Sequence, residues 1–397
     1  MTAPISLEGT NLRLERKFAF SAVIPFLLLF ALLYADFGAA SPFLPSLMEA
    51  RGIPAEQIGI IFGTATAIRL ISAPIAGQVA DRTQALRATL AACTIATALA
   101  LSASGFWVLL AVSLLHALAL APTTNLADAL AVVAAKREGF EYGWARVAGS
   151  AAFIVGSIAA GFAITTFGIW IAVVLQALLM LAVPFALRLV PPVTHSTPTK
   201  AEVTQQGLPA LLRMGVFRRV VLVAALVLGS HALHDTFSII RWTKAGISPQ
   251  ASGALWSLAV AAEVVMFFVG GPWLLARMQP AHAMAIAAVA GAVRWFVSAV
   301  TVDLTALILI QPLHGVTFAL LHLACMRILA TSVPPELAAT AQAIYGTVGI
   351  GAATAALTMA SGWLYSGLGG LAFLAMSLLC IAALPVTFSL VNAEKHA

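Results

Sequence analysis

The feature that most constrains this chain is a succession of long apolar stretches that fills almost its whole length. A helix of about 20 apolar residues spans the hydrocarbon core of a bilayer. No stretch alternates between polar and apolar residues as barrel strands do, and lipid leaves no partner for unpaired backbone groups. The sequence therefore predicts an all-α membrane protein. We expect twelve transmembrane helices, at residues 20–47, 55–80, 86–103, 106–134, 144–166, 168–190, 217–241, 252–277, 281–300, 304–330, 338–364 and 368–391.

Composition excludes a water-facing surface over most of the molecule. Charged residues make up 9% and hydrophobic residues 61% of the 397 residues, whereas soluble domains carry about 25% charged residues. Cys93, Cys325 and Cys380 lie in separate apolar stretches without a Cys-x-x-Cys pair, so neither a disulfide framework nor a metal site is predicted. We expect no cofactor. Nucleic acid is not an expected partner either, because the basic residues lie in short loops between apolar stretches.

The longest polar stretch divides the chain near its middle. It is rich in proline and polar residues, which is typical of a linker. We therefore expect an N-terminal six-helix half at residues 1–190, a cytoplasmic central linker at 191–216 and a C-terminal six-helix half at 217–397.

Lysine and arginine are distributed unequally between the two faces of the predicted bundle. With the N-terminus in the cytoplasm, the outer face holds only Arg51, Arg241 and Lys244. The positive-inside rule then predicts a multi-pass protein of the cell (inner) membrane with both termini in the cytoplasm. The cytoplasmic segments hold Arg13, Arg16, Lys17, Arg82, Arg87, Lys136, Arg137, Arg188, Lys200, Arg213, Arg218, Arg219, Arg277 and Lys395.

Several charged or titratable residues fall inside the predicted helices. A charge at the bilayer centre costs about 2.5–3.5 kcal/mol and persists where it is paired or lines a wet cavity. We expect these residues to line a central polar cavity; the alternative is that some lie at helix ends or form isolated structural ion pairs. They are Asp36, Arg69, Asp128, Arg146, Asp235, Glu263, Arg294 and His314.

Two sets of these residues have informative spacings. Asp128 and Arg146 flank a tight turn, so the two antiparallel helices can bring them to a similar depth as an ion pair. Arg146 is also suited to binding a carboxylate with two hydrogen bonds. His231, His234 and Asp235 share one helix face. These three residues form either a proton relay or a polar helix end. A separate possibility is an ion pair between Asp36 and Arg69.

The turn after the second predicted helix resembles the loop signature of the major facilitator superfamily. It contains Gly77, Asp81 and Arg82, followed by Arg87, but lacks the next glycine and the paired basic residues of the signature. The resemblance implies a fold of two six-helix halves and a single chain as the complete unit, so a monomer is expected. It also implies that Asp81, Arg82 and Arg87 form a conformational latch.

Residues of the fourth and fifth predicted helices resemble the lactose permease group of oligosaccharide–proton symporters. Asp128 and Arg146 have the spacing of that family's sugar-binding pair, and Phe153 replaces its sugar-stacking Trp. Three further residues, Glu263, Arg294 and His314, resemble the coupling residues of that family. The family's proton-binding Glu is Thr317 here, so the proton route differs or coupling is absent.

The chain resembles the phenylpropionate permeases more closely. The likeness includes Arg69, the segment from Arg146 to Phe153, Trp256 with the two residues after it, and the segment from His314 to Arg327. It implies an organic anion rather than a sugar. The three arginines in predicted helices fit an anion, because only a cation offsets a carboxylate at low dielectric.

We therefore expect a proton-coupled importer of a small organic acid, with aromatic acids as candidates. Arg146, Asp128, Phe153, Arg69 and Arg294 are the candidate substrate-binding residues. The candidates for proton coupling are Asp36, Asp235, Glu263 and His314. The alternatives are a sugar or nucleoside proton symporter, a drug-type exporter of the same fold, and a membrane assembly or sensor protein without transport. No nucleotide loop or nucleophile constellation predicts an enzyme.

Overall fold

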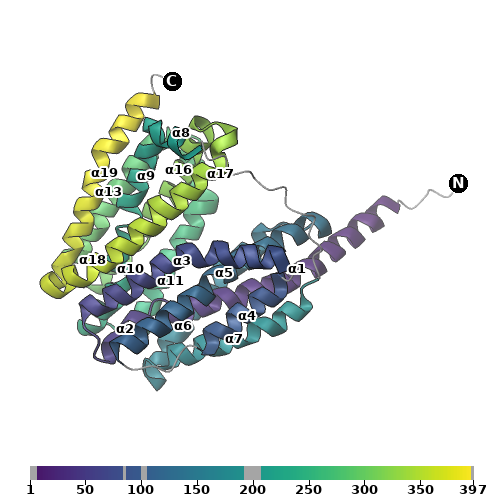
Figure 1. The fold of residues 1–397 in the computed structure, drawn as a ribbon, viewed down its shortest axis with the longest axis horizontal. Coiled ribbons are helices and arrows are strands. Elements are labelled where there is room, and N and C mark those ends of the chain that lie inside the picture. The colour runs from purple at the N-terminus through teal and green to yellow at the C-terminus, as the bar shows by residue number, and fades with distance from the viewer. Residues whose placement is uncertain (1–6, 84–85, 100–104, 192–206, 395–397) are drawn as a thin grey trace.

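The computed structural model describes residues 7–83, 86–99, 105–191 and 207–394, and this part of the chain contains helices and no strand. The helices form two groups that lie side by side (Figure 1). The N-terminal group comprises α1 (Leu7–Ala40), α2 (Leu44–Ala50), α3 (Ala55–Thr83), α4 (Leu86–Leu99), α5 (Phe106–Glu138), α6 (Gly143–Phe167) and α7 (Ile171–Leu189). The short helix α8 (Gly207–Arg213) precedes the second group.

The C-terminal group consists of more interrupted helices. Three π-helical segments, Met266–Gly270, Val316–Leu320 and Tyr345–Ala352, lie within its longer helical stretches. The α-helices of the group are α9 (Gly215–Val227), α10 (His231–Lys244), α11 (Pro249–Val265), α12 (Gly271–Leu275), α13 (Pro280–Val300), α14 (Leu304–Ile310), α15 (Leu313–Gly315), α16 (Leu321–Ser332), α17 (Ala338–Ile344), α18 (Ala353–Leu368) and α19 (Phe373–Glu394).

Nine helical stretches of the described residues are long and apolar enough to cross a membrane. The stretch Pro335–Val391 contains two of the predicted helices, joined at a 3-10 turn. Two predicted helices, α3 and α4, are not among the nine, and the described part of α4 has only 14 residues. The all-helical membrane architecture is confirmed, while the count of twelve stays a prediction.

Local sequence signals explain where several helices begin and end. Ser248 accepts a hydrogen bond from the backbone of Ala251 and Pro249 occupies the first turn of α11, a common helix start. Asp303 caps α14 in the same way. Gly139 ends α5 in the left-handed conformation, which glycine adopts without steric cost. This turn reverses the chain into α6.

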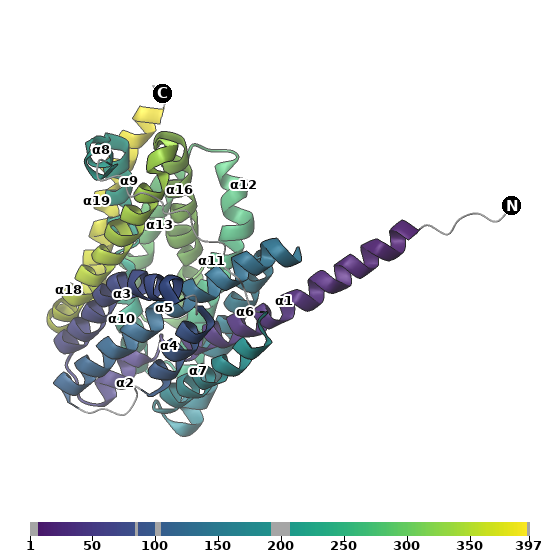
Figure 2. The ribbon, with the colours of Figure 1, turned by 45° about the vertical axis from the view of Figure 1, so that its right-hand side comes forward.

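The two groups meet mainly at the end of the bundle away from the chain termini. There, Lys244 Nζ on α10 lies 2.5 Å from Glu49 Oε1 on α2, and Ser366 on α18 donates a hydrogen bond to Glu56 on α3. The backbones of Gly59 and Gly362 approach too closely to admit a Cβ atom. Toward the side where α1 begins and α19 ends, here called the terminal side, the two groups diverge (Figures 1 and 2).

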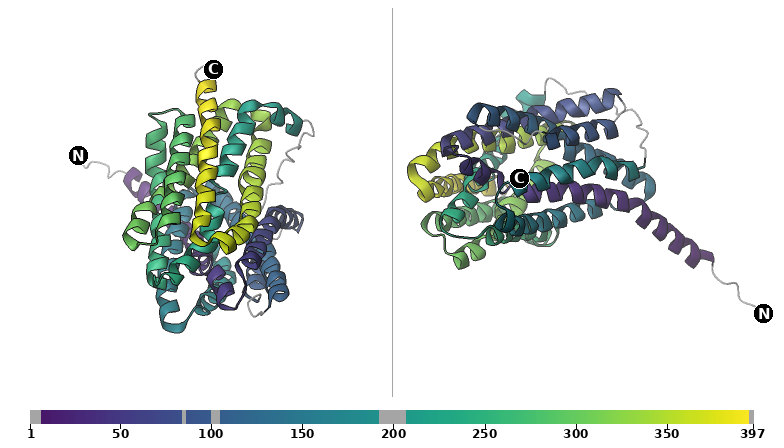
Figure 3. Two further views of the ribbon diagram at one scale, coloured as in Figure 1. Left: turned by 90° about the vertical axis from the view of Figure 1, so that its left-hand side faces the viewer. Right: turned by 90° about the horizontal axis from the view of Figure 1, so that it is seen from below.

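The first helix is the longest of the N-terminal group and projects beyond the bundle at its beginning (Figures 2 and 3). Its inner part packs on α6 and α7, where Phe26, Phe30 and Leu33 are fully buried. The two helix groups therefore form a V whose interior is open toward the terminal side.

Candidate functional site

A central cavity of about 390 Å³ lies between the two helix groups. The N-terminal group contributes Phe62, Thr66 and Arg69 from α3. The C-terminal group contributes Asp235 from α10 and Trp256 from α11, together with Phe318, Thr354 and Thr358. The cavity thus combines one arginine, one carboxylate, three large aromatic rings, the imidazoles of His234 and His314, and several hydroxyl groups.

Arg69 is the cation that this cavity exposes. Its side chain is exposed to the cavities rather than packed in the core, and it lines three neighbouring cavities at once. Among the residues that the structure describes, no carboxylate lies within 4.0 Å of its guanidinium. An unpaired guanidinium of this kind can bind an anion without first giving up an internal partner.

The predicted contact between Asp128 and Arg146 is present. Arg146 Nη1 lies 3.5 Å from Asp128 Oδ2, and Tyr142 donates a 2.7 Å hydrogen bond to Asp128 Oδ1. Arg146 also donates to the hydroxyl of Tyr34, whose ring lies 5.3 Å from the guanidinium carbon. These residues lie toward the terminal side and do not line the central cavity. Arg146 is therefore already partly neutralised by its own neighbours.

Arg294 forms the centre of a buried network in the C-terminal group. Its side chain is 0% exposed. Its Nη2 donates to Gln311 Oε1 at 2.9 Å and approaches His234 Nε2 at 3.4 Å, while Nη1 lies 3.0 Å from His314 Nδ1. In this conformation Arg294 does not line the central cavity, and its role in substrate binding stays a prediction.

The chemistry of arginine fixes the tautomer of both histidines. Because a guanidinium only donates hydrogen bonds, His314 Nδ1 and His234 Nε2 must accept. His314 therefore carries its proton on Nε2, which lies 3.3 Å from Glu263 Oε2. His234 carries its proton on Nδ1, which lies 3.2 Å from Asp235 Oδ1. One arginine is thus joined through two imidazoles to two carboxylates.

Thr317, which stands at the position compared above with the Glu of the lactose permease group, contacts a third histidine through its hydroxyl group. His231 Nε2 lies 3.0 Å from Thr317 Oγ1, and Thr317 also bonds to the backbone carbonyl of His314. His322 on α16 contacts the hydroxyl of Tyr345 at 3.1 Å. The two acids nearest this region are Glu263 and Asp235, whose side chains are 30% and 52% exposed.

Asp36 lies outside these networks, in the interior of the N-terminal group. The residue is fully buried, and neither carboxyl oxygen has a hydrogen-bond partner. The polar neighbour of Asp36 is Gln176 on α7. The Oε1 atom of Gln176 also lacks a hydrogen-bond partner. The Nε2 atom of Gln176 lies 3.4 Å from His116 Nε2 on α5. The pairing of Asp36 with Arg69 that the sequence allowed is not formed.

Two other groups of predicted site residues lie elsewhere. Phe153 is half-buried on α6, where its backbone packs against Gly38, and it does not line the central cavity. The side chains of Asp81 and Arg82 lie outside the described residues. Arg87 donates to the carbonyl of Leu187 within the N-terminal group, so it does not link the two groups in this conformation.

Sequence reasoning missed several polar residues of these networks. Tyr34 and Gln311 accept hydrogen bonds from Arg146 and Arg294, and Tyr142 donates to Asp128. His116 and Gln176 accompany Asp36. Gln176 and Gln311 are isolated amides in apolar stretches, and that isolation was the available signal. The two tyrosines gave none, because tyrosine is also common at membrane interfaces.

Comparison with known proteins places the chain among membrane transporters. A profile described as MFS_1 like family matches residues 25–375. The chain is 33% identical over 359 residues to a probable 3-phenylpropionic acid transporter of Escherichia coli (strain K12). The alignment covers 88% of this chain and 93% of that protein.

Solved structures agree on the fold. A variant of the nucleoside transporter NupG superposes with a TM-score of 0.82 at 17% identity, covering 93% of this chain and 98% of that one. A bacterial homologue of the human lysosomal transporter Spinster, in an inward-facing conformation, gives 0.72 at 15% identity, covering 94% and 96%. The human organic anion transporter TETRAN gives 0.60 at 18% identity, covering 93% and 99%. At these identities the likeness shows the fold alone.

Proposed function

The chain belongs to the MFS_1 like family of membrane transporters, and from that premise we propose that it takes up a small aromatic acid together with protons. The observation that carries the substrate class is Arg69, an unpaired cation in a cavity that also holds aromatic rings. A carboxylate transferred from water into this cavity needs a cation to offset its lost hydration. Arg69 is the cation with no internal carboxylate to displace.

The relative that is named a probable 3-phenylpropionic acid transporter supports the same class of substrate. Trp256 and Phe318 provide aromatic surface in the cavity, and pockets for small organic molecules are commonly apolar with a few placed polar groups. Asp128 and Arg146 are the second candidate site, toward the terminal side. Because Arg146 already contacts Asp128 and Tyr34, its role in this proposal is secondary to that of Arg69.

Proton coupling is assigned to the carboxylates around Arg294. A proton on His314 would place a second positive charge about 3 Å from the guanidinium, which is costly at low dielectric. Glu263 and Asp235 can take a proton without this penalty, because each loses a negative charge in doing so. The imidazoles of His234 and His314 then connect the protonation of these two carboxylates to Arg294. Asp36 is a further candidate, since a proton on its carboxyl group would supply the donor that Gln176 Oε1 lacks.

The proposed cycle is alternating access. The two helix groups touch at the end away from the termini and diverge on the terminal side (Figure 1). With both termini in the cytoplasm, this is an inward-open arrangement. Solute bound near Arg69 would face the cytoplasm here and the outside after the groups rock about the site.

The test is uptake by purified protein in liposomes that carry a pH-sensitive dye inside. Adding 3-phenylpropionate outside should acidify the interior, and glucose or uridine should not. Arg69→Gln should abolish the response. Acidification with sugars or nucleosides alone would contradict the proposed aromatic-acid substrate. Uptake of 3-phenylpropionate without acidification would contradict the proposed proton coupling. Solute release driven by an inward proton gradient would instead indicate an exporter.

A further inference from the structure

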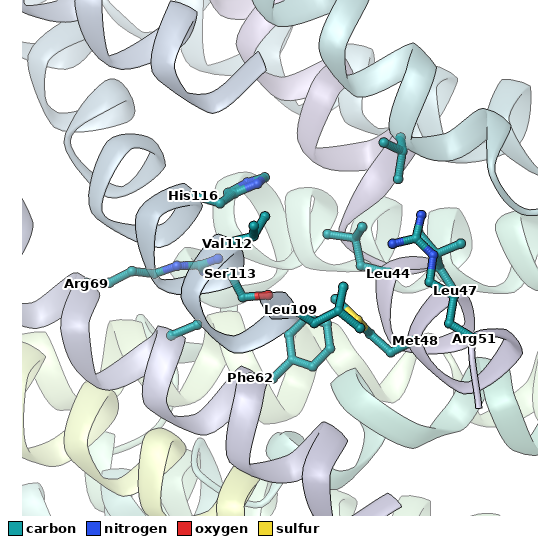
Figure 4. A pocket seen from close by; sticks show the side chains of 12 residues that line it. Leu44, Leu47, Met48, Arg51, Phe62, Arg69, Leu109, Val112, Ser113 and His116 are labelled. Carbon is teal, nitrogen blue, oxygen red and sulfur yellow. The ribbon is translucent and has the colours of Figure 1, made fainter. Parts of the chain in front are cut away.

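A second cavity lies inside the N-terminal group, next to the central one. It is enclosed by α2, α3 and α5, with Val173 of α7 closing one side. Its middle is apolar, formed by Leu44, Phe62, Leu109 and Val112 (Figure 4). This region is here called the side cavity.

Polar groups of the side cavity are confined to its ends. Figure 4 shows Arg69, Ser113 and His116 around one end and Arg51 at the other. No acidic residue is among the described residues that line it. Arg69 also lines the central cavity, so its guanidinium lies where the two cavities adjoin.

The size of the side cavity selects what it can hold. The space for water-sized molecules measures about 60 Å³. One water needs about 10–15 Å³ of such space, so the side cavity has room for roughly five waters. Five waters occupy about 150 Å³ in the liquid. An engineered cavity of about that volume in another protein binds benzene. This volume matches one six-membered ring and leaves too little room for a second fused ring unless side chains move.

The chemistry of the two cavities also differs. A ring in the central cavity could lie against Trp256 and Phe318, but it would also cover Asp235 and the hydroxyl of Thr354. Burying polar groups without new hydrogen bonds is unfavourable. A ring in the side cavity would contact aliphatic and aromatic side chains. It would leave its carboxylate at the junction, beside Arg69.

We propose that the side cavity is the specificity pocket of the transporter: it takes the single ring of an arylalkanoate whose carboxylate binds Arg69. This inference rests on the proposed function and adds which cavity holds the ring. The central cavity then serves the carboxylate and the coupled protons, and the N-terminal group holds the solute.

The experiment measures ligand binding to the full-length purified protein by titrating its thermal stabilisation. The probes are propionate, 3-phenylpropionate and 3-(2-naphthyl)propionate, which differ only in having no ring, one ring and two fused rings. Because burial of a phenyl ring is favourable, 3-phenylpropionate should bind at least about tenfold more tightly than propionate. The naphthyl compound should bind at least about tenfold more weakly than the phenyl compound.

Two substitutions change the side cavity in opposite directions. Val112→Phe should fill it, reducing 3-phenylpropionate to the affinity of propionate while propionate binding is kept. Leu109→Ala should enlarge it and raise the affinity of the naphthyl compound by at least about tenfold. The matched control is Val108→Phe, which adds the same side chain one turn away at a 52% exposed position on α5. It should leave all three affinities unchanged.

Outcomes that contradict the proposal are distinct from failure of the proposed function. If the wild-type protein binds none of the carboxylates, both are overturned. If ring preference persists in Val112→Phe and is lost in Trp256→Ala, the ring lies in the central cavity and only the placement is wrong. If Val112→Phe fails to fold, the Leu109→Ala variant alone tests the placement of the ring. If this variant does not bind the naphthyl compound more tightly than the wild-type protein does, the proposal that the side cavity holds the ring is wrong.

Discussion

The two helix groups bond their polar residues within the helices to different extents. In the C-terminal group, Arg294 is bonded to Gln311 and shared with two histidines that lead to carboxylates. In the N-terminal group, Arg69 has no ion-pair partner among the described residues, and both oxygens of Asp36 lack hydrogen bonds. Both terminal nitrogens of Arg294 are bonded, and its Nε atom lacks a partner. A largely bonded network favours one arrangement, whereas unpaired groups are free to bind something from outside.

Backbone geometry follows the same division. Within the described residues, π-helical segments occur only in the C-terminal group, and one of them, Val316–Leu320, contains Thr317 beside His314. Such segments often mark functional sites because they shift side chains out of the regular helical register. On our proposal, the N-terminal group binds the solute and the C-terminal group chiefly handles the protons.

The largest effect is expected at Arg69. Removing one partner of a buried charge pair costs about 2–5 kcal/mol, so Arg69→Gln should weaken binding of 3-phenylpropionate by at least about 30-fold. Arg146→Gln should weaken it less, because Arg146 is engaged with Asp128 and Tyr34. Binding titrations of both variants check this order. The reverse order would move the anion site to Arg146 and break the division between the groups.

The next effect is expected at Glu263. Glu263→Gln keeps the side-chain size and a hydrogen-bond acceptor for His314 but cannot take up a proton. We expect exchange of labelled substrate across liposomes to remain, while accumulation driven by a pH gradient falls at least about tenfold. The matched variant Glu336→Gln changes an acid on an exposed turn far along the chain and should keep both activities. Accumulation that survives Glu263→Gln would remove Glu263 from the proton path.

A smaller effect, on stability, distinguishes two acids of the N-terminal group, Asp36 and Asp128. At neutral pH, Asp36→Asn should leave the unfolding temperature unchanged or higher, because it replaces a carboxyl group that makes no hydrogen bond. Asp128→Asn should lower it, because it removes the ion pair with Arg146. Thermal unfolding in detergent measures both. A marked loss of stability in Asp36→Asn would show that its carboxylate has an essential partner.

The smallest effect is expected at the contact between the two groups. Lys244 and Glu49 are 61% and 32% exposed, and exposed ion pairs contribute about 0–1 kcal/mol. Glu49→Gln should therefore shift the populations of the two conformations by at most about fivefold, in favour of opening on the side away from the termini. Labelling rates of a cysteine introduced at Ser46 would report this shift. No change in rate would show that other contacts, such as that between Glu56 and Ser366, hold this end closed.

The sequence by itself determined the membrane helices and the contact between Asp128 and Arg146. Hydropathy decides which segments enter lipid, and the helical rise fixes the depth of residues on either side of one tight turn. Tertiary structure alone joined Arg294 to His234, 60 residues away, and left Arg69 at the junction of two cavities. Such relations depend on the rotation of each helix about its axis and on how helices distant in sequence pack. Apolar stretches that are hydrophobic on all sides do not specify that rotation.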